Sequence, residues 1–226
     1  MNSSILPPRV VEDIFLRWKA DSLVAQTGCV VLIADILGDE TGWTWHDRDK
    51  YDTVRKKVLL PDENGERKQL ENRVQAAIDT ISTQHGVDKD RIGVMGFCLG
   101  GHPVLELARM KNPSVKALVT FHGVFDSIKK LSPVSSGQDV VNDCNVLVCS
   151  GADDPFVADE DLSEAMSTFN KLGYQSKLMK FENTSKFIQS GYYVSTFPHC
   201  LTSSFTQITN EQRAWIYQSS TRFQPK

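Results

Sequence analysis

Short apolar segments alternate with amphipathic segments along most of the chain. The apolar segments show little polar alternation, which is typical of strands that helices cover on both faces. They are bounded by glycine, proline or charged turn residues. This pattern predicts strands at residues 29–34, 91–97, 115–121, 145–150 and 176–181.

The amphipathic segments between these strands carry apolar residues at helical spacing. In the segment Leu70 to Gln84, for example, Leu70, Val74, Ala77, Ile78 and Ile81 share one face. Strands that alternate with helices indicate an α/β fold with a mostly parallel sheet and helices on both faces. We expect helices at residues 16–26, 70–84, 102–110, 159–171 and 210–219, with a loop or short-helix insertion at 38–68.

Length and composition are those of one globular domain spanning 1–226. The chain has 226 residues, 40% of them hydrophobic and 23% charged, with a net charge of −3. These values argue against disorder, and no apolar run is long enough to span a membrane. Without a basic surplus we expect no nucleic acid and no membrane as partner, and a monomer is favoured. Five cysteines without a CxxC pair, behind a start that lacks a secretory signal, indicate a reducing, cytoplasmic setting.

Because functional groups gather at the carboxyl ends of parallel strands, the residues that follow each strand are informative. Directly after the strand at 91–97 stands Gly96-Phe97-Cys98-Leu99-Gly100-Gly101. A nucleophile between two glycines, on a strand-to-helix turn, is the nucleophile elbow. The following helix directs its amino terminus at the thiol and favours negative charge there. The sequence therefore predicts Cys98 as a nucleophile, although a glycine-rich turn with a buried thiol would look similar.

Two further segments supply an acid and a base. Asp153 and Asp154 follow the strand at 145–150, and His199 lies in the segment Phe197-Pro198-His199-Cys200. Considered alone, either aspartate would be interpreted as a solvated turn residue, and His199 as a surface histidine. The chain order nucleophile, acid, base is the order of the α/β-hydrolase fold. No two histidines stand at metal-ligand spacing, so we expect no metal, and no motif calls for a cofactor.

With these residues the chain resembles the dienelactone hydrolase family of α/β-hydrolases, from about Val10 onward. The resemblance rests on the Cys98 elbow, on 154–157 (Asp-Pro-Phe-Val), on 121–123 (Phe-His-Gly), on the His199 loop and on 11–15 (Val-Glu-Asp-Ile-Phe). It implies a Cys98–Asp154–His199 triad, with Asp154 preferred to Asp153, and an oxyanion hole formed by the N–H groups of Leu99 and Ile14. It also implies a substrate pocket lined by Asp13, Asp35, His122 and Phe156. Since nine residues precede Val10, we expect the outer N-terminal strands of the family to be lacking.

The resemblance implies a hydrolase that cleaves small esters or lactones through a thioester acyl-enzyme on Cys98. No arginine follows His199 closely, so dienelactone itself is not the expected substrate. Two other interpretations remain open. One is a catalytically weak or silent family member that binds a small molecule or a partner. The other is a redox or thiol-transfer protein that pairs Cys98 with Cys200.

Overall fold

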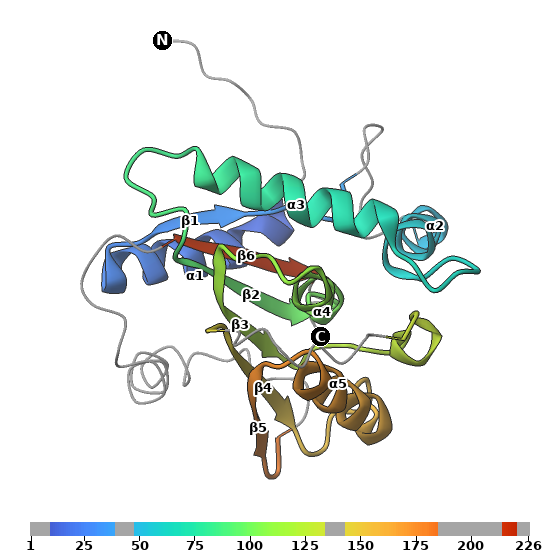
Figure 1. Cartoon of the computed structure of the whole chain (residues 1–226). Coiled ribbons are helices and arrows are strands. Elements are labelled where there is room, and N and C mark those ends of the chain that lie inside the picture. Colours follow the sequence, from blue (N-terminus) through green and yellow to red (C-terminus); the bar gives the residue numbers. More distant parts are fainter. Residues whose placement is uncertain (1–9, 39–47, 134–142, 185–213, 221–226) are drawn as a thin grey trace.

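A sheet of parallel strands forms the centre of the molecule (Figure 1). The structure is a computed structural model, and it describes residues 10–38, 48–133, 143–184 and 214–220. Its strand order is β1-β6-β2-β3-β4-β5, and each neighbouring pair is parallel. The strands are β1 (Val30–Ile33), β2 (Ile92–Cys98), β3 (Val115–Phe121), β4 (Asn145–Gly151), β5 (Gln175–Phe181) and β6 (Ala214–Ser220).

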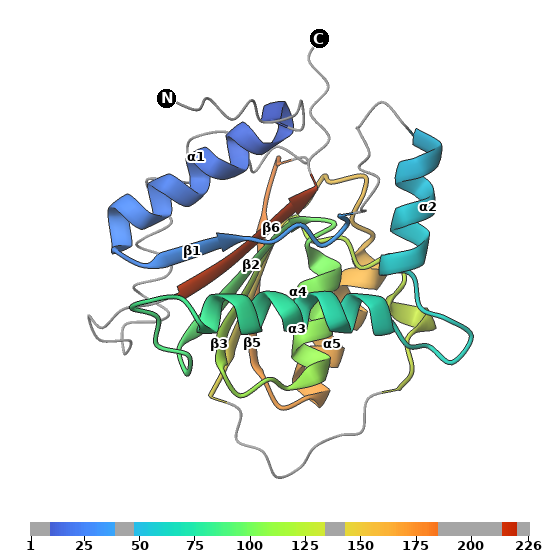
Figure 2. The same cartoon turned by 90° about the horizontal axis from the view of Figure 1, so that it is seen from above.

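Helices cover both faces of this sheet (Figure 2). Helix α1 (Val10–Thr27) lies against one face, where it packs on β1 and β6. The opposite face carries α3 (Lys68–Ser82), α4 (Gly101–Met110) and α5 (Asp159–Lys171), with α2 (Arg48–Leu59) beside α3. A short 3₁₀ turn, η1 (Ile128–Lys130), packs against α5. The predicted α/β architecture with a parallel sheet is confirmed.

The apolar periodicity located the core correctly. The five residues predicted to share a face of α3 are all buried: Leu70, Val74, Ala77, Ile78 and Ile81. Strand β2 is buried along its whole length, as expected of a central strand covered on both faces. Alternate side chains of β2 therefore enter two separate clusters. Ile92 and Val94 join the large cluster beneath α3, α4 and α5, and Met95 and Phe97 join the smaller one on the α1 face.

One predicted element is wrong. Residues 210–219 were expected to form a last helix, but 214–220 form strand β6 between β1 and β2. Ala214 pairs with Val30 on one side and with Ile92 on the other. The segment Ala214-Trp215-Ile216-Tyr217 is aromatic and β-branched, which suits a strand, and pairing on both sides outweighs helix propensity. Within the described residues, no helix is long and apolar enough to cross a bilayer.

Candidate active site

Cys98 occupies a strained turn at the carboxyl end of β2. Its backbone has φ of 55°, a left-handed conformation that is uncommon outside glycine. The glycines on either side leave room for the turn to close. A Cβ added to Gly96 would lie 2.2 Å from the carbonyl oxygen of Gly100, and one added to Gly100 would lie 2.5 Å from the nitrogen of Phe97. The turn therefore has the geometry of a nucleophile elbow, as the glycine pattern predicted, and we call it the elbow.

Backbone hydrogen bonds fix the elbow on both of its sides. The N–H of Gly100 donates to the carbonyl oxygen of Phe97 at 2.8 Å, and that of Val124 donates to the carbonyl oxygen of Cys98 at 2.9 Å. Among the described residues the N–H of Leu99 has no such partner. Helix α4 begins at Gly101, so its amino terminus follows Cys98 directly. Free N–H groups and the helix dipole both favour an anion at this position.

The acid candidates differ sharply in their surroundings. Asp153 is exposed, whereas the Asp154 side chain is buried in the turn that follows β4. Asp154 Oδ1 accepts the N–H of Phe156 at 2.9 Å. Asp154 Oδ2 is buried and has no hydrogen-bond partner among the described residues. A buried carboxylate oxygen without a partner is costly, so this atom is suited to a donor supplied by another group.

The carboxyl ends of β2 and β4 lie on one edge of the sheet with β3 between them (Figure 1). Two strand spacings separate them by about 10 Å. His199, the predicted base, and Cys200 lie outside the described residues. The described segment that precedes them ends at Thr184, 15 residues before His199. Fifteen residues can extend about 50 Å, so this length of chain can bring an imidazole to either turn.

The remaining predicted residues fall in different environments. Ile14 and Asp13 lie in the second turn of α1. Within a helix the N–H groups beyond the first four bond to carbonyl groups one turn earlier, so the Ile14 N–H takes that helical position. Asp35 is exposed after β1, and Phe156 is 49% exposed beside Asp154. His122 is buried at φ of 40°, and its N–H donates to the carbonyl oxygen of Cys149 at 2.8 Å.

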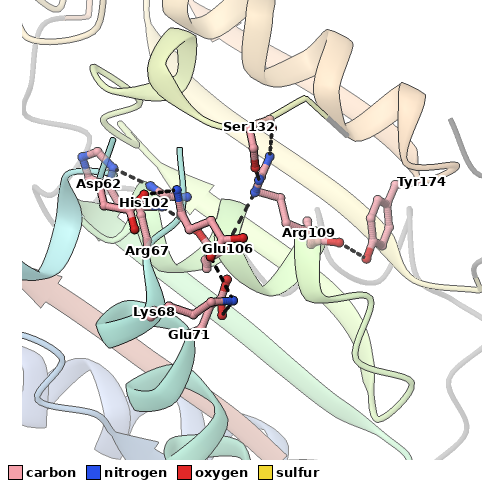
Figure 3. A network of polar contacts seen from close by, with 11 residues as sticks. Asp62, Arg67, Lys68, Glu71, His102, Glu106, Arg109, Ser132 and Tyr174 are labelled. Atoms are coloured by element: carbon pink, nitrogen blue, oxygen red, sulfur yellow. Dashed lines mark hydrogen bonds and ion pairs between the residues drawn. The ribbon is translucent and has the colours of Figure 1, made fainter. Parts of the chain in front are cut away.

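The sequence analysis did not anticipate a set of polar side chains on and beside helix α4 (Figure 3). Arg67, His102 and Glu106 are all buried, and Arg67 contacts the other two. A signal was available for two of them, because polar residues at 102, 106 and 109 form a stripe along an otherwise apolar helix. Nothing in the sequence marks Arg67, whose partners lie 35 and 39 residues away.

No group of three or more histidine, cysteine or carboxylate side chains is arranged for a metal ion within the described parts of the chain. Four of the five cysteines lie in those parts, and all four are buried: Cys29, Cys98, Cys144 and Cys149. The thiols other than Cys98 are buried in the sheet or beside it. Burial, with Asp143 nearby, raises the pKa of Cys144 to about 12.

Two curated proteins are similar to the chain in sequence. The chain is 28% identical over 146 residues to a probable 2-oxo-3-(5-oxofuran-2-ylidene)propanoate lactonase of Bradyrhizobium, covering 62% of this chain and 54% of that protein. It is 34% identical over 71 residues to an uncharacterized protein of Caenorhabditis elegans, covering 31% of this chain and 43% of that protein. The chain thus spans about half the length of the curated relatives it matches.

Two solved structures share the fold. One is a dienelactone hydrolase-like promiscuous phosphotriesterase, P91, from metagenomic libraries, with a TM-score of 0.50 and 30% identity, covering 67% of this chain and 57% of that one. The other, named m3DLH, has a TM-score of 0.50 and 27% identity, covering 66% of this chain and 56% of that one. The sequence model of the dienelactone hydrolase family matches residues 17–191, which include the elbow and the Asp154 turn. This match extends over most of the chain, which therefore belongs to the dienelactone hydrolase family.

Proposed function

We propose that the protein is a hydrolase that cleaves small carboxylic esters or lactones through a thioester on Cys98. The observation that carries this proposal is the Cys98 elbow itself, with φ of 55° between two glycines that admit no Cβ, directly before α4. Strain of this kind persists only where the surrounding structure imposes it, and it is typical of functional sites. The name of the Bradyrhizobium relative, a probable lactonase, points to the same class of substrate.

In this proposal His199 is the base and Asp154 orients it. The Cys98 sulfur attacks the carbonyl carbon, its proton passes to His199, and a tetrahedral oxyanion forms. The oxyanion collapses, His199 returns the proton to the leaving alkoxide, and the acyl group stays on sulfur as a thioester. Water then attacks the thioester, His199 takes a proton from it and returns that proton to the departing thiolate. The buried, unpartnered Oδ2 of Asp154 supports its role as acceptor of the second imidazole N–H.

The oxyanion needs hydrogen-bond donors, and the first is the N–H of Leu99. It follows the nucleophile, and no described residue accepts it. The family pattern assigns the second donor to Ile14, whose N–H lies within α1. In that helical position the group is committed to a carbonyl oxygen, so Ile14 can serve only if the first turns of α1 open. One missing donor typically costs about 2.7–4 kcal/mol of barrier, which slows an enzyme without abolishing catalysis.

The same position of Ile14 favours a second candidate function, a catalytically weak or silent family member that binds a small molecule. Such a protein would keep the fold and the strained thiol without turning over an ester. The two candidates differ in one measurable property. Only the hydrolase releases product at a rate that depends on Cys98.

The test compares wild type with Cys98→Ala on a panel of p-nitrophenyl esters and small lactones. We expect turnover by wild type and a loss of about 10⁴-fold or more in kcat for Cys98→Ala. Cys149→Ala is the matched control, because it removes a buried thiol from β4, two strands away from β2, and should leave kcat unchanged. Equal turnover by wild type and Cys98→Ala would refute the hydrolase proposal, and no turnover by wild type would favour the silent member.

Thiol labelling checks the same assignment without a substrate. Iodoacetamide should alkylate Cys98 first at neutral pH, since thiolate character and access control the rate. Cys144, with its pKa raised to about 12 by burial, should stay unlabelled in the native protein. Mass spectrometry of the non-reduced protein also tests the redox alternative, which requires a disulfide between Cys98 and Cys200.

A further inference from the structure

A cluster of polar side chains lies along helix α4, which begins just after the elbow, and three of its members, Arg67, His102 and Glu106, are buried. We call it the α4 polar cluster, and Figure 3 shows most of it. Helix α4 contributes three members at positions 102, 106 and 109, which form a single stripe because they are spaced by four and three residues. Its members are His102, Glu106 and Arg109 of α4, Arg67 from the turn before α3, Asp126 and Ser132 from the segment after β3, and Arg55 of α2.

Arg67 organises the cluster with a guanidinium that is buried. Its Nε donates to Glu106 Oε2 at 2.5 Å, and its Nη1 lies 3.2 Å from His102 Nδ1. An arginine has no acceptor, so Nδ1 of His102 must accept this hydrogen bond. The proton of the neutral ring is therefore on Nε2. That atom lies 3.2 Å from Asp126 Oδ1, and Asp126 also forms an ion pair with Arg55.

His102 is connected to the elbow through the backbone. It follows Cys98 by four residues, and its N–H donates to the carbonyl oxygen of Leu99 at 3.1 Å. The other side of the elbow is held by Val124, whose N–H donates to the carbonyl oxygen of Cys98 at 2.9 Å. Asp126 is two residues beyond Val124 and so belongs to the segment that holds the elbow. His102 contacts Asp126 with one ring nitrogen and Arg67 with the other, and it therefore connects that segment to the turn before α3.

Arg109 ties the same two segments together one turn further along α4. Its Nη1 donates to the carbonyl oxygen of Ser132 at 3.0 Å, and its Nη2 donates to Ser132 Oγ at 2.9 Å. The N–H of Ser132 in turn donates to the carbonyl oxygen of Gly65, in the turn that carries Arg67. Together with the His102 contacts, these hydrogen bonds join α4, along most of its length, to the segment after β3 and to the turn before α3.

Stability alone does not account for such a cluster. Buried charges lose their hydration, and well-packed apolar side chains of similar volume often give an equally stable or more stable protein. What a directional network supplies is one defined arrangement of the elements it joins. Here those elements are the helix that starts at the elbow, the segment after β3 and the turn before α3.

We propose that His102 is a positioning residue for the reaction at Cys98. In its neutral Nε2–H form it fixes the rotation of the first turn of α4, and through that turn it sets the direction of the Cys98 sulfur and of the Leu99 N–H. This inference rests on the proposed function. His102 itself contacts neither the substrate nor the Cys98 sulfur, and it acts only through the position of α4.

Protonation of His102 would break its hydrogen bond with Arg67 and replace it with a repulsion between two positive charges. A proton on Nδ1 would point at the Arg67 guanidinium, and a positive ring would lie between Arg67 and the Arg55–Asp126 pair. Burial lowers the pKa of His102, which keeps the ring neutral at physiological pH. The other charged members of the cluster are Glu106 and Arg109. Glu106 accepts a hydrogen bond from Arg67, and Arg109 donates one to Ser132.

The test uses His102→Leu, which removes both ring nitrogens at similar volume, and His102→Asn, whose side-chain oxygen can still accept from Arg67. We expect His102→Leu to fold and to lose about 10–100-fold in kcat with little change in KM, as small misplacements of reacting groups do. His102→Asn should recover part of that loss. Lys68→Ala is the matched control, because Lys68 neighbours Arg67 but forms only exposed ion pairs with Glu66 and Glu71.

The second readout is the rate at which iodoacetamide alkylates Cys98, measured against pH. A positioning role shifts this profile in His102→Leu, whereas a purely structural role lowers the melting temperature and leaves the profile unchanged. If His102→Leu does not fold, Arg67→Lys breaks the same contact more mildly, and it should shift the profile in the same direction. A folded variant with wild-type kcat and a wild-type profile would overturn the inference. Failure of the hydrolase proposal is a different result, since it appears as turnover that survives Cys98→Ala.

Discussion

The turn after β2 and the turn after β4 are built in opposite ways. The Cys98 turn is fixed from within, by glycines that leave no space for a Cβ and by backbone hydrogen bonds on both sides. The Asp154 turn holds its carboxylate with the N–H of Phe156 and leaves Oδ2 buried without a partner among the described residues. The Cys98 thiol is therefore held in place by its own turn, whereas the Asp154 carboxylate keeps one buried oxygen that can accept a hydrogen bond from a third group.

The largest effect that would sharpen this contrast is expected from Asp154→Asn. An asparagine can still accept the Phe156 N–H, so the turn should keep its shape. The amide cannot hold the charged imidazole, and the corresponding change in a serine protease lowers kcat by about 10⁴-fold. We expect a loss of that order in ester turnover, with a wild-type unfolding curve.

Asp153→Asn is the matched control for this measurement, because Asp153 is the exposed neighbour in the same turn. It should change kcat by less than about twofold, since surface substitutions away from such contacts have small effects. An equal loss in both variants would show that the two turns do not differ in the way described.

Adding a methyl group to the elbow should have the next largest effect. In Gly96→Ala the new Cβ would lie 2.2 Å from the Gly100 carbonyl oxygen, so the turn must open. Overpacking of this kind destabilises a protein by about 1–3 kcal/mol or more. Urea unfolding measures this loss, and esterase activity should fall with it.

Gly28→Ala provides the comparison for the elbow variant. Gly28 has φ of 67° but no atom within 4 Å of an added Cβ, so it carries only the cost of its backbone conformation. That cost is about 1–2 kcal/mol. A Gly96→Ala protein that is more stable than Gly28→Ala, with full activity, would show that the elbow is not fixed by close packing.

The smallest expected effect concerns the pH dependence of stability. Burial lowers the pKa of His102 below its usual 6.5, so the unfolded chain takes up this proton first as the pH falls. The native state therefore loses free energy of unfolding below pH 6.5, by at most about 1.4 kcal/mol for each pH unit down to the native pKa. Asp126, whose pKa the His102 contact lowers to about 2, contributes only in stronger acid, below about 3.8.

Urea titrations between pH 7.5 and pH 5 measure this loss, and the protein with His102→Asn should lose less over the same range. Identical slopes in the two proteins would mean that His102 titrates in the same way folded and unfolded. The polar cluster would then not restrain the elbow in the manner inferred.

The fold was predictable from the sequence because its signals are local. The apolar runs of β3 and β4 and the periodicity of α3 and α5 each mark an element without reference to the rest of the chain. The exception is 214–220, whose strand depends on pairing with β1 and β2, segments more than a hundred residues earlier in the sequence. The local pattern of apolar residues could not reveal that this segment pairs between β1 and β2.

The same distinction separates the parts of the candidate site. The elbow was predictable because glycine, cysteine and glycine lie within five residues and their spacing has one steric explanation. The resemblance preferred Asp154 to Asp153, but the difference in their burial could not be predicted, because two adjacent aspartates look alike in sequence. The contact of Arg67 with His102 spans 35 residues and has no sequence signal at all.

The central claim is that an acyl group passes through the sulfur of Cys98. Rapid acid quenching of the protein with p-nitrophenyl acetate, followed by peptide mass spectrometry, tests it directly. We expect one added acetyl group, on the peptide that contains Cys98, formed no more slowly than the enzyme turns over. Turnover without acetylation of that peptide, or with acetyl found only on another residue, would contradict it.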